Sequence, residues 1–555
     1  MALLGLAIMG LTAFGAPPHP AAPEAAIPAA PGDSLNRIVE LYWDERVVPG
    51  NPLSAQFLAD SLDVERRFLL EVLAVPRAAL DAQAALTYDI FKRQRELDIE
   101  SFTYPSELMP VNPFDGEPQR LASVAVYLTQ HPLKTGKDYE DWQLRIDDYI
   151  RWTRQAVANM REGMRRGYTL PKVLMQHMLP PLHDFGNDTP DNPFYGPLRT
   201  LPEVIKEPER TRIATSLATA VKDRLLPAYR ELHDFIQSEY LARARSSISL
   251  SALPLGPSWY SSLVRRVAGP KATPGEIHAV GLAEVERLRT RLNSLPAAAP
   301  PAAQGDLTNA YQELKERTLA AMPTLFSDAP PAGFEIRALV PVGEAAPPLA
   351  YRRASPESGT PAILYVNAGN GTRPATLETA AFLLEAIPGR HYQWSLQRQR
   401  TQLPRFRRFG SEPAYADGWA LYAASLGEEL GVYRDDEARR GSILAQLKCA
   451  AALVVDTGIH AMNWTRAQAA GYLRAQLSAE EADADSMADR IVASPGSGLA
   501  CKMGELKIQA LRSRAVEMLG PRFDIREFHS EILKDGAMPL DILEAKVNLW
   551  MGAGR

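Results

Sequence analysis

Apolar residues recur at three- and four-residue spacing along most of the chain, which is the period of an amphipathic helix. Between Ser34 and about Val157 this spacing is visible in LNRIVELYWDERV, VERRFLLEVLAV and LTYDIFKRQRELDIESF, and another long helical pattern covers 209–244. Residues 273–293 begin with the signals of a helix start, namely Thr273 as N-cap, Pro274 and a capping-box Glu276. Helical spacing returns after Thr376 and continues to the C-terminus. The pattern predicts a mainly α-helical protein.

Three short runs in the middle of the chain have the composition of β-strands instead. They are FEIRALV at 334–340, LAYRRAS at 349–355 and AILYVNAG at 362–369, each rich in β-formers and bounded by Pro or Gly. No internal repeat of 20–50 residues accompanies them. The predicted fold class is therefore mainly α (α+β), with a small sheet inside one large domain over residues 34–555.

The N-terminus carries an apolar run of fourteen residues, 3–16, followed by a Pro/Ala-rich segment at 17–33. The run is too short to cross a bilayer comfortably and is typical of the hydrophobic region of a secretory signal. We therefore expect a signal peptide over 1–16, an extended linker over 17–33, a periplasmic or secreted location and no stable membrane span. The alternative is an uncleaved N-terminal helix. Because no cysteine follows the run, we expect no lipid anchor there.

Composition narrows the possible partners. Hydrophobic residues make up 46% of the 555 residues and charged residues 23%, as in ordinary globular proteins. The formal charge is only −5, with acidic and basic residues interspersed, so nucleic acid is not an expected partner. The two cysteines, Cys449 and Cys501, allow a single disulfide, which the sequence alone leaves open.

Residues 384–391, Leu-Glu-Ala-Ile-Pro-Gly-Arg-His, carry the main chemical signal. They resemble the His-Glu-Ala-x-Pro-Gly-His-His signature of a bacterial family called domain of unknown function 885, a zincin-like group of metallopeptidases. The resemblance extends over about 35–550 and includes YADGWALY at 415–422 and LVVDTGIH at 453–460. It implies a large helical zincin-like peptidase fold, with a small sheet beside the active-site helix and a deep cleft. It also implies that the Pro-Gly pair breaks the helix that carries the motif.

At several positions to which the resemblance assigns a role in metal binding, this chain has residues of a different type. Leu384 and Arg390 stand where the family has histidines; the first cannot coordinate a cation and the second would repel Zn²⁺. His391 and Asp417 remain as weak, vestigial metal ligands. Glu385 is either a desolvated general base with a raised pKa or a helix-terminal carboxylate. We expect the guanidinium of Arg390 to replace the charge of the metal by pairing with Glu385 or Asp417.

Several downstream residues complete the candidate site. The resemblance suggests that Tyr422 supplies an aromatic hydroxyl and that His460 donates to a developing oxyanion, beside Asp456. The alternative for His460 is a buried structural imidazole whose tautomer is fixed by Asp456. We expect His529 to be a packing residue. Four further positions, Cys449, Ala452, Ser497 and Cys501, depart from the family pattern.

Three hypotheses follow. In the first, a secreted relative of zinc peptidases, without metal or other cofactor, binds a peptide, a small amide-type ligand or a partner without efficient hydrolysis. In the second, an active hydrolase with an altered zinc site uses Glu385 as general base. In the third, the chain is a non-enzymatic structural or assembly component.

Overall fold

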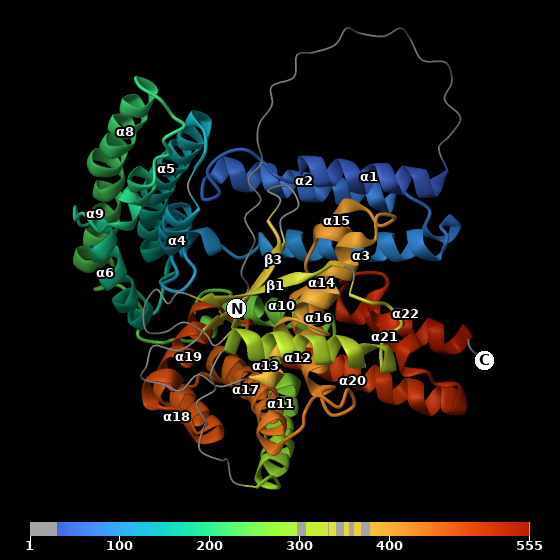
Figure 1. Cartoon of the computed structure of the whole chain (residues 1–555). Helices are drawn as coiled ribbons and strands as arrows, with labels where there is room; N and C mark the ends of the chain where they lie inside the picture. Colours follow the sequence, from blue (N-terminus) through green and yellow to red (C-terminus); the bar gives the residue numbers. More distant parts are fainter. Residues whose placement is uncertain are drawn as a thin grey trace, which may run out of the picture.

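The computed structural model describes residues 30–131, 133–296, 307–330, 332–339, 349–354, 360–367 and 378–553. These residues are mainly helical and enclose a small three-stranded sheet, which confirms the predicted fold class at that level (Figure 1). The predicted signal peptide and most of the predicted linker lie outside the described residues. The last three linker residues are helical, because α1 begins at Pro31 and proline is well tolerated in the first helical turn.

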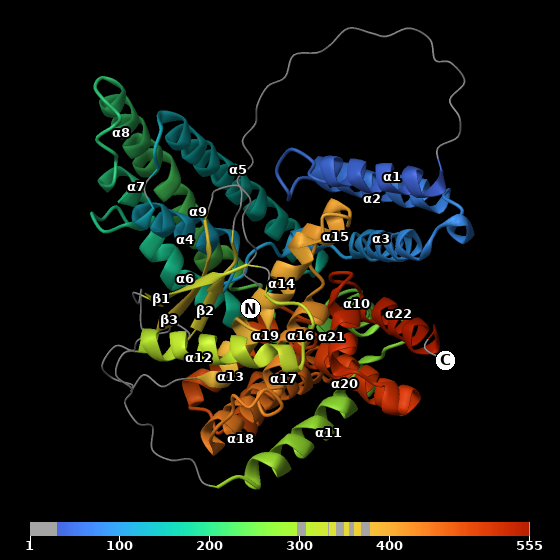
Figure 2. The ribbon, with the colours of Figure 1, turned by 45° about the vertical axis from the view of Figure 1, so that its right-hand side comes forward.

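The N-terminal part forms two groups of helices. The first group is α1 (Pro31–Glu45), α2 (Ala55–Leu73) and α3 (Ala82–Ser101). The second is α4 (Glu117–Gln130), α5 (Gly136–Arg166), α6 (Lys172–Gly186), α7 (Gly196–Arg199), α8 (Glu209–Ala220) and α9 (Leu226–Phe235). The helical pattern predicted over 209–244 forms α8 and α9, with a π-helical turn at Val221–Leu225 between them and a second one at Ile236–Tyr240 after α9. The second group forms the lobe on the left of Figures 1 and 2.

The central part contains the sheet. It follows α10 (Gly256–Ala268), α11 (Pro274–Asn293) and α12 (Leu307–Ala321), and its strands are β1 (Phe334–Leu339), β2 (Leu349–Arg352) and β3 (Ala362–Asn367). The strand order is β1-β3-β2, with β1 parallel and β2 antiparallel to β3. All three predicted strands are present within the described residues, and β2 ends at Arg352, so that Arg353 and Ala354 do not belong to it. The capping box of Thr273 and Glu276 is also confirmed.

The C-terminal part contributes to both large hydrophobic clusters of the core. Its helices are α13 (Thr379–Glu385), α14 (Arg390–Gln399), α15 (Arg405–Phe409), α16 (Pro413–Ser425), α17 (Asp436–Met462), α18 (Arg466–Leu477), α19 (Glu481–Ala493), α20 (Ala500–Leu519), α21 (Ile525–Leu533) and α22 (Leu540–Ala553). One hydrophobic cluster joins α1–α3, the sheet, α13–α16 and α20–α22; a second joins α4–α9 with α17–α19. A smaller cluster around α10 lies beside them. Among the described helices α17 alone is long and apolar enough to cross a membrane, and 72% of its apolar window is buried inside the protein.

The close crossing of α16 and α20 in this core involves two glycines. A Cβ added to Gly418 on α16 would lie 2.3 Å from Cα of Gly504 on α20, and one added to Gly504 would lie 1.8 Å from the carbonyl oxygen of Ala414. These distances are far shorter than any real Cβ contact, so only glycine allows the two backbones to approach so closely. The crossing fixes Asp417, the neighbour of Gly418, in the site described next.

Candidate functional site

The motif of residues 384–391 spans a break between two helices. α13 ends at Glu385 and α14 begins at Arg390, which confirms the predicted helix break at the Pro-Gly pair. A Cβ on Gly389 would lie 2.0 Å from the carbonyl oxygen of Leu384, so the tight return of the chain requires glycine there. The indole Nε1 of Trp419 donates to the carbonyl of Pro388 at 2.9 Å and ties the break to α16. The break therefore turns Arg390 back toward the residue that ends α13.

Arg390 lies between two carboxylates. Its Nε is 3.3 Å from Oε2 of Glu385, and its Nη1 donates to Oδ1 of Asp417 from α16. All three side chains are 26% exposed, so the cluster remains accessible to solvent. The predicted pairing of Arg390 with Glu385 or Asp417 is confirmed, and Arg390 engages both carboxylates rather than one.

The environment of this cluster perturbs its titration. Burial raises the pKa of Glu385, partly opposed by the positive charge of Arg390 and reinforced by Asp417. Burial works against the charge of Arg390, but the carboxylates of Asp417 and Glu385 outweigh it and raise the pKa of that guanidinium. Glu385 is therefore a carboxyl with a raised pKa at the end of α13, which agrees with both of its interpretations, and Arg390 remains a permanent cation.

His391 does not face this cluster. Its Nε2 donates to the carbonyl of Ala332 at 2.9 Å, and its Nδ1 accepts from the hydroxyl of Tyr351 at 2.8 Å. Burial lowers the pKa of His391, so the ring is neutral and both nitrogens are engaged. Leu384 packs against the main hydrophobic cluster. Of the four motif positions 384, 385, 390 and 391, only Glu385 and Arg390 come together with Asp417.

Tyr422 belongs to a different network. His529 donates from Nδ1 to the carbonyl of Leu325 at 2.8 Å, so its Nε2 accepts from the hydroxyl of Tyr422 at 2.8 Å. Arg512 donates to the same hydroxyl at 3.3 Å and pairs with Glu429 at 2.7 Å. Burial lowers the pKa of His529 to about 4. The neutral, fully hydrogen-bonded ring matches the predicted packing role of His529.

His460 and Asp456 lie on α17 but have separate partners. The Nδ1 of His460 accepts from the backbone N–H of Leu250 at 3.1 Å, and Nε2 donates to the carbonyl of Ile491 at 3.2 Å. These backbone groups, and not Asp456, fix its tautomer, so the predicted orientation by Asp456 is wrong. Burial lowers the pKa of His460 to about 3. Within the described residues His460 makes no hydrogen bond or ion pair with Glu385, Arg390 or Asp417.

Asp456 instead holds the loop that precedes α20. It accepts from the hydroxyl of Tyr260 at 2.7 Å and from the backbone N–H groups of Gly496 and Gly498 at 3.0 and 2.9 Å. Burial raises the pKa of Asp456 to about 6 despite these three donors. The position of this loop sets where α20 begins, one residue before Cys501.

The two cysteines are paired. Cys449 on α17 and Cys501 on α20 form a disulfide with their Cα atoms 6.1 Å apart. The sequence left this bridge open because 52 residues separate the two thiols and only the packing of α17 against α20 brings them together. The bridge fits an oxidising compartment.

The residues present do not fit a zinc ion. Zinc needs three or four neutral imidazole, thiolate or carboxylate donors around one point. In the described parts of the chain, no group of three or more His, Cys, Asp or Glu side chains has such an arrangement. Around Glu385 and Asp417 the remaining positions are an aliphatic Leu384 and a cationic Arg390, and the lone pair of His391 is taken by Tyr351. The cluster provides an internal ion pair in place of a coordination sphere.

Two residues beside this site, Arg353 and Trp394, were not predicted from the sequence. Arg353, just after β2, places its guanidinium 4.0 Å from the ring centroid of Trp394 on α14, one helical turn beyond Arg390. The nearby charges of Arg390 and Asp417 reach Arg353 as well, and burial lowers its pKa. The helical spacing of Arg390 and Trp394 was readable from the sequence, but the approach of β2 to α14 was not.

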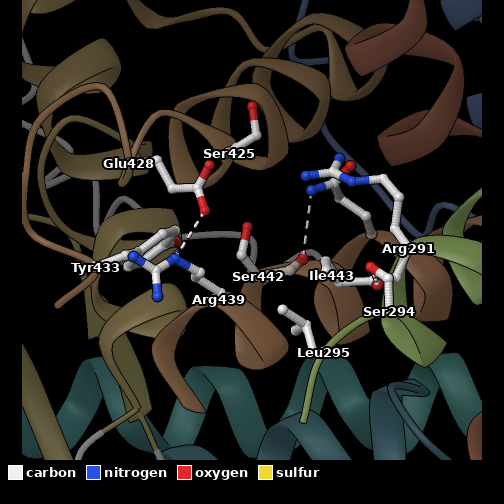
Figure 3. A pocket seen from close by; sticks show the side chains of 10 residues that line it. Arg291, Ser294, Leu295, Ser425, Glu428, Tyr433, Arg439, Ser442 and Ile443 are labelled. Atoms are coloured by element: carbon white, nitrogen blue, oxygen red, sulfur yellow. Dashed lines mark hydrogen bonds and ion pairs between the residues drawn. The ribbon is translucent and has the colours of Figure 1, made fainter. Parts of the chain in front are cut away.

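A cavity lies elsewhere, between α11, α16 and α17. Its volume is about 120 Å³, and Glu428 and Arg439 pair across its edge at 3.0 Å (Figure 3). Sites for drug-sized ligands occupy roughly 300–1,000 Å³. This cavity is therefore too small for a peptide segment.

Comparison with known proteins places this architecture in one family. The family model described as "Bacterial protein of unknown function (DUF885)" matches residues 50–547. A crystal structure of a "putative lipoprotein" from Colwellia psychrerythraea is 23% identical, with a TM-score of 0.81, and the match covers 94% of this chain and 99% of that one. A "putative lipoprotein of unknown function" from Shewanella oneidensis is 12% identical with a TM-score of 0.64, over the same shares. No curated protein matches the chain. At these identities the two structures show a shared fold.

Proposed function

Because the chain belongs to the bacterial DUF885 family, we propose that it is an exported, metal-free binding protein that takes peptides or small amide-type ligands without efficient hydrolysis. The observation that carries this proposal is the ion-paired position of Arg390 between Glu385 and Asp417. A permanent cation there neutralises the carboxylates that a zincin would use for metal and water. The zincin-like character of the fold and the deep cleft are parts of this proposal.

The same cluster offers ligand-binding chemistry. A partly exposed guanidinium and two carboxylates present donors and acceptors that match the amide groups and termini of an extended peptide. The proposed export is supported by the names of the two relatives in solved structures and by the Cys449–Cys501 bridge.

A direct test is the zinc content of protein purified without chelator, together with cleavage and binding assays on a mixed peptide library. We expect sub-stoichiometric zinc, no cleavage and a thermal shift with part of the library. A peptide at a hundred times its dissociation constant adds about 2.7 kcal/mol of stability. Stoichiometric zinc or peptide cleavage would overturn the proposal, and no shift with any peptide would favour a structural or assembly role instead.

A restored variant serves as the matched positive control. Leu384→His, Arg390→His and Asp417→Glu together rebuild the donor types of the family signature, and we expect this triple variant to take up zinc where the native chain does not. A triple variant that stays free of zinc would show that the native chain lost metal binding through more than these three positions.

The second candidate is a hydrolase that uses Glu385 as general base. The raised pKa of this partly exposed carboxyl favours it, because a general base works best with a pKa near the ambient pH. Glu385→Gln separates the two candidates. If the chain only binds peptides, both the native protein and this variant leave the library uncleaved. If the chain is a hydrolase, the native protein cleaves the library at a measurable rate and the variant does not.

A further inference from the structure

A continuous row of arginines and aromatic rings begins beside the Glu385–Arg390–Asp417 cluster and ends on the N-terminal helices. The guanidinium carbons lie over the rings at centroid distances of 4.0 Å (Arg353 on Trp394), 5.4 Å (Arg398 on Trp394), 4.7 Å (Arg398 on Phe409), 5.0 Å (Arg408 on Phe409) and 3.4 Å (Arg46 on Trp43). The rings of Trp43 and Phe409 are 5.7 Å apart and close the row. We call these seven residues the arginine row.

The backbone explains why the row is continuous. Arg390, Trp394 and Arg398 are spaced by four residues on α14 and so share one helix face. Figures 1 and 2 both show α15 against α1, with α14 between α15 and α16. Phe409 at the end of α15 and Trp43 on α1 therefore extend the same line.

Three arginines of the row have no carboxylate partner within the described residues. Neighbouring arginines are satisfied internally: Arg400 pairs with Asp328, and Arg405 with Glu40 and Asp44. In contrast, Arg46, Arg353 and Arg408 form no ion pair with any carboxylate in the described part of the chain. Arg46, Arg353 and Arg408 thus carry positive charge that no ion pair within the described residues neutralises, although the whole chain is slightly acidic.

Burial of a polar group points to a ligand in the same place. Trp394 is only 9% exposed, and within the described part of the chain its buried indole Nε1 has no hydrogen-bond partner. Buried polar groups are nearly always hydrogen-bonded, so an unpaired donor under two guanidiniums marks a place for an acceptor. Carboxylates accept from both indole N–H groups and guanidiniums.

The geometry also discriminates between anionic partners. A bilayer surface would need protruding apolar side chains, whereas Trp394 is buried and Trp43 and Phe409 are half-buried. A sugar ring would stack on an open aromatic face, but guanidiniums already cover these rings. The guanidiniums of the row supply N–H donors along this line, and the stretch from Arg390 to Arg398 alone extends about 12 Å. That length matches three to four residues of extended chain at roughly 3.3 Å each.

We infer that the arginine row binds the acidic side chains of an extended peptide whose backbone reaches the Glu385–Arg390–Asp417 cluster. This inference rests on the proposed function and specifies its ligand class as a peptide rich in Asp or Glu.

The test is fluorescence anisotropy of the full native chain with a labelled, acetylated six-residue peptide of alternating Gly and Glu, compared with its Gly/Gln counterpart. We expect the Glu peptide to bind about tenfold or more tightly, as charge-assisted contacts require. The preference should weaken as the salt concentration rises, because the contacts are partly exposed. Equal affinity of the two peptides would overturn the inference.

Variants at the two ends of the row locate the peptide. Arg353→Gln and Arg46→Gln should each weaken the Glu peptide about tenfold and leave the Gln peptide unchanged, whereas Arg337→Gln, an exposed arginine on β1, should change neither. Circular dichroism confirms that each variant is folded. Loss of affinity in Arg337→Gln, or none in Arg353→Gln, would overturn the inference.

Two further arms separate this inference from the proposed function. Tighter binding of polygalacturonate or of phosphatidylglycerol vesicles than of the Glu peptide would assign the row to another anion and overturn the inference. A mixed peptide library that binds without any preference for Glu overturns the inference but keeps the proposed function. A library that does not bind at all overturns both.

Discussion

Replacing Arg390 by methionine tests the electrostatic logic of the site most directly. The substitution keeps a long side chain and removes the charge between Glu385 and Asp417. Two unit charges 3.3 Å apart interact with about 5 kcal/mol at an effective dielectric constant near 20. Desolvation of the pair offsets part of this gain. We therefore expect Arg390→Met to lower the free energy of unfolding by about 2–4 kcal/mol near neutral pH.

The loss should depend on pH in a defined direction. Burial already raises the pKa of Glu385, and the variant loses the cation that holds it down while Asp417 remains. A carboxyl whose pKa is higher in the folded than in the unfolded chain binds more protons when folded, so its contribution to stability is lost as pH rises through the folded pKa. Each tenfold rise in the proton affinity of Glu385 corresponds to about 1.4 kcal/mol. The destabilisation should therefore be small near pH 4 and largest above about pH 7.

Urea unfolding followed by tryptophan fluorescence at several pH values measures this difference. Arg165→Met is the matched control, because Arg165 pairs with Glu162 on the surface of α5 with its side chain 72% exposed. A solvent-screened pair of this kind contributes little to stability, so this control should change little at any pH. A pH-independent loss in Arg390→Met, or one no larger than that of Arg165→Met, would refute the reasoning.

Three further predictions concern the framework that holds the site. Gly504→Ala should destabilise the protein by more than about 3 kcal/mol, because the added Cβ would overlap the carbonyl of Ala414. Gly471→Ala is the control and should not destabilise the protein, since the space around Gly471 is open. Equal thermal midpoints for the two variants would contradict this prediction. Replacing Cys449 and Cys501 together by serine should lower the free energy of unfolding by about 4 kcal/mol, because the disulfide closes a loop of 52 residues in the unfolded chain. Urea unfolding of this variant is compared with that of the native chain, with and without reductant. An unchanged urea midpoint would show that the bridge is not a structural constraint. Tyr422→Phe should lower the free energy of unfolding by about 1–3 kcal/mol, because it leaves the buried Nε2 of His529 without its donor. Tyr195→Phe is the control and should lose little stability, since the hydroxyl of Tyr195 bonds to the exposed Asp188. Similar losses in both variants would argue against the bond between Tyr422 and His529.

Local sequence patterns predicted the helices, strands and helix ends, because these depend on residues that are close together in the sequence. Helical spacing, the three β-rich runs and the capping box at Thr273 gave the elements, and the Pro-Gly pair correctly placed the break before Arg390. The pairing of Arg390 followed from charge alone, since a buried cation needs a counter-charge.

The remaining contacts depend on residues far apart in the sequence. His391 is held by Ala332 and by Tyr351 on β2, Tyr422 by His529 107 residues away, and Asp456 by a loop beyond α19. A motif cannot specify such partners, because the packing of whole elements brings them together. This is why the sequence grouped Tyr422, Asp456 and His460 with Glu385, although in the structure each of the three has other hydrogen-bond partners.

The glycine crossing of α16 and α20 sets the position of Asp417. Because the two backbones are in contact at Gly418 and Gly504, a side chain at either position would force the two helices apart. Asp417 therefore stands on a helix whose distance from α20 is set by backbone contact. A substitution at Gly504, although it lies on another helix, should consequently displace the carboxylate that pairs with Arg390.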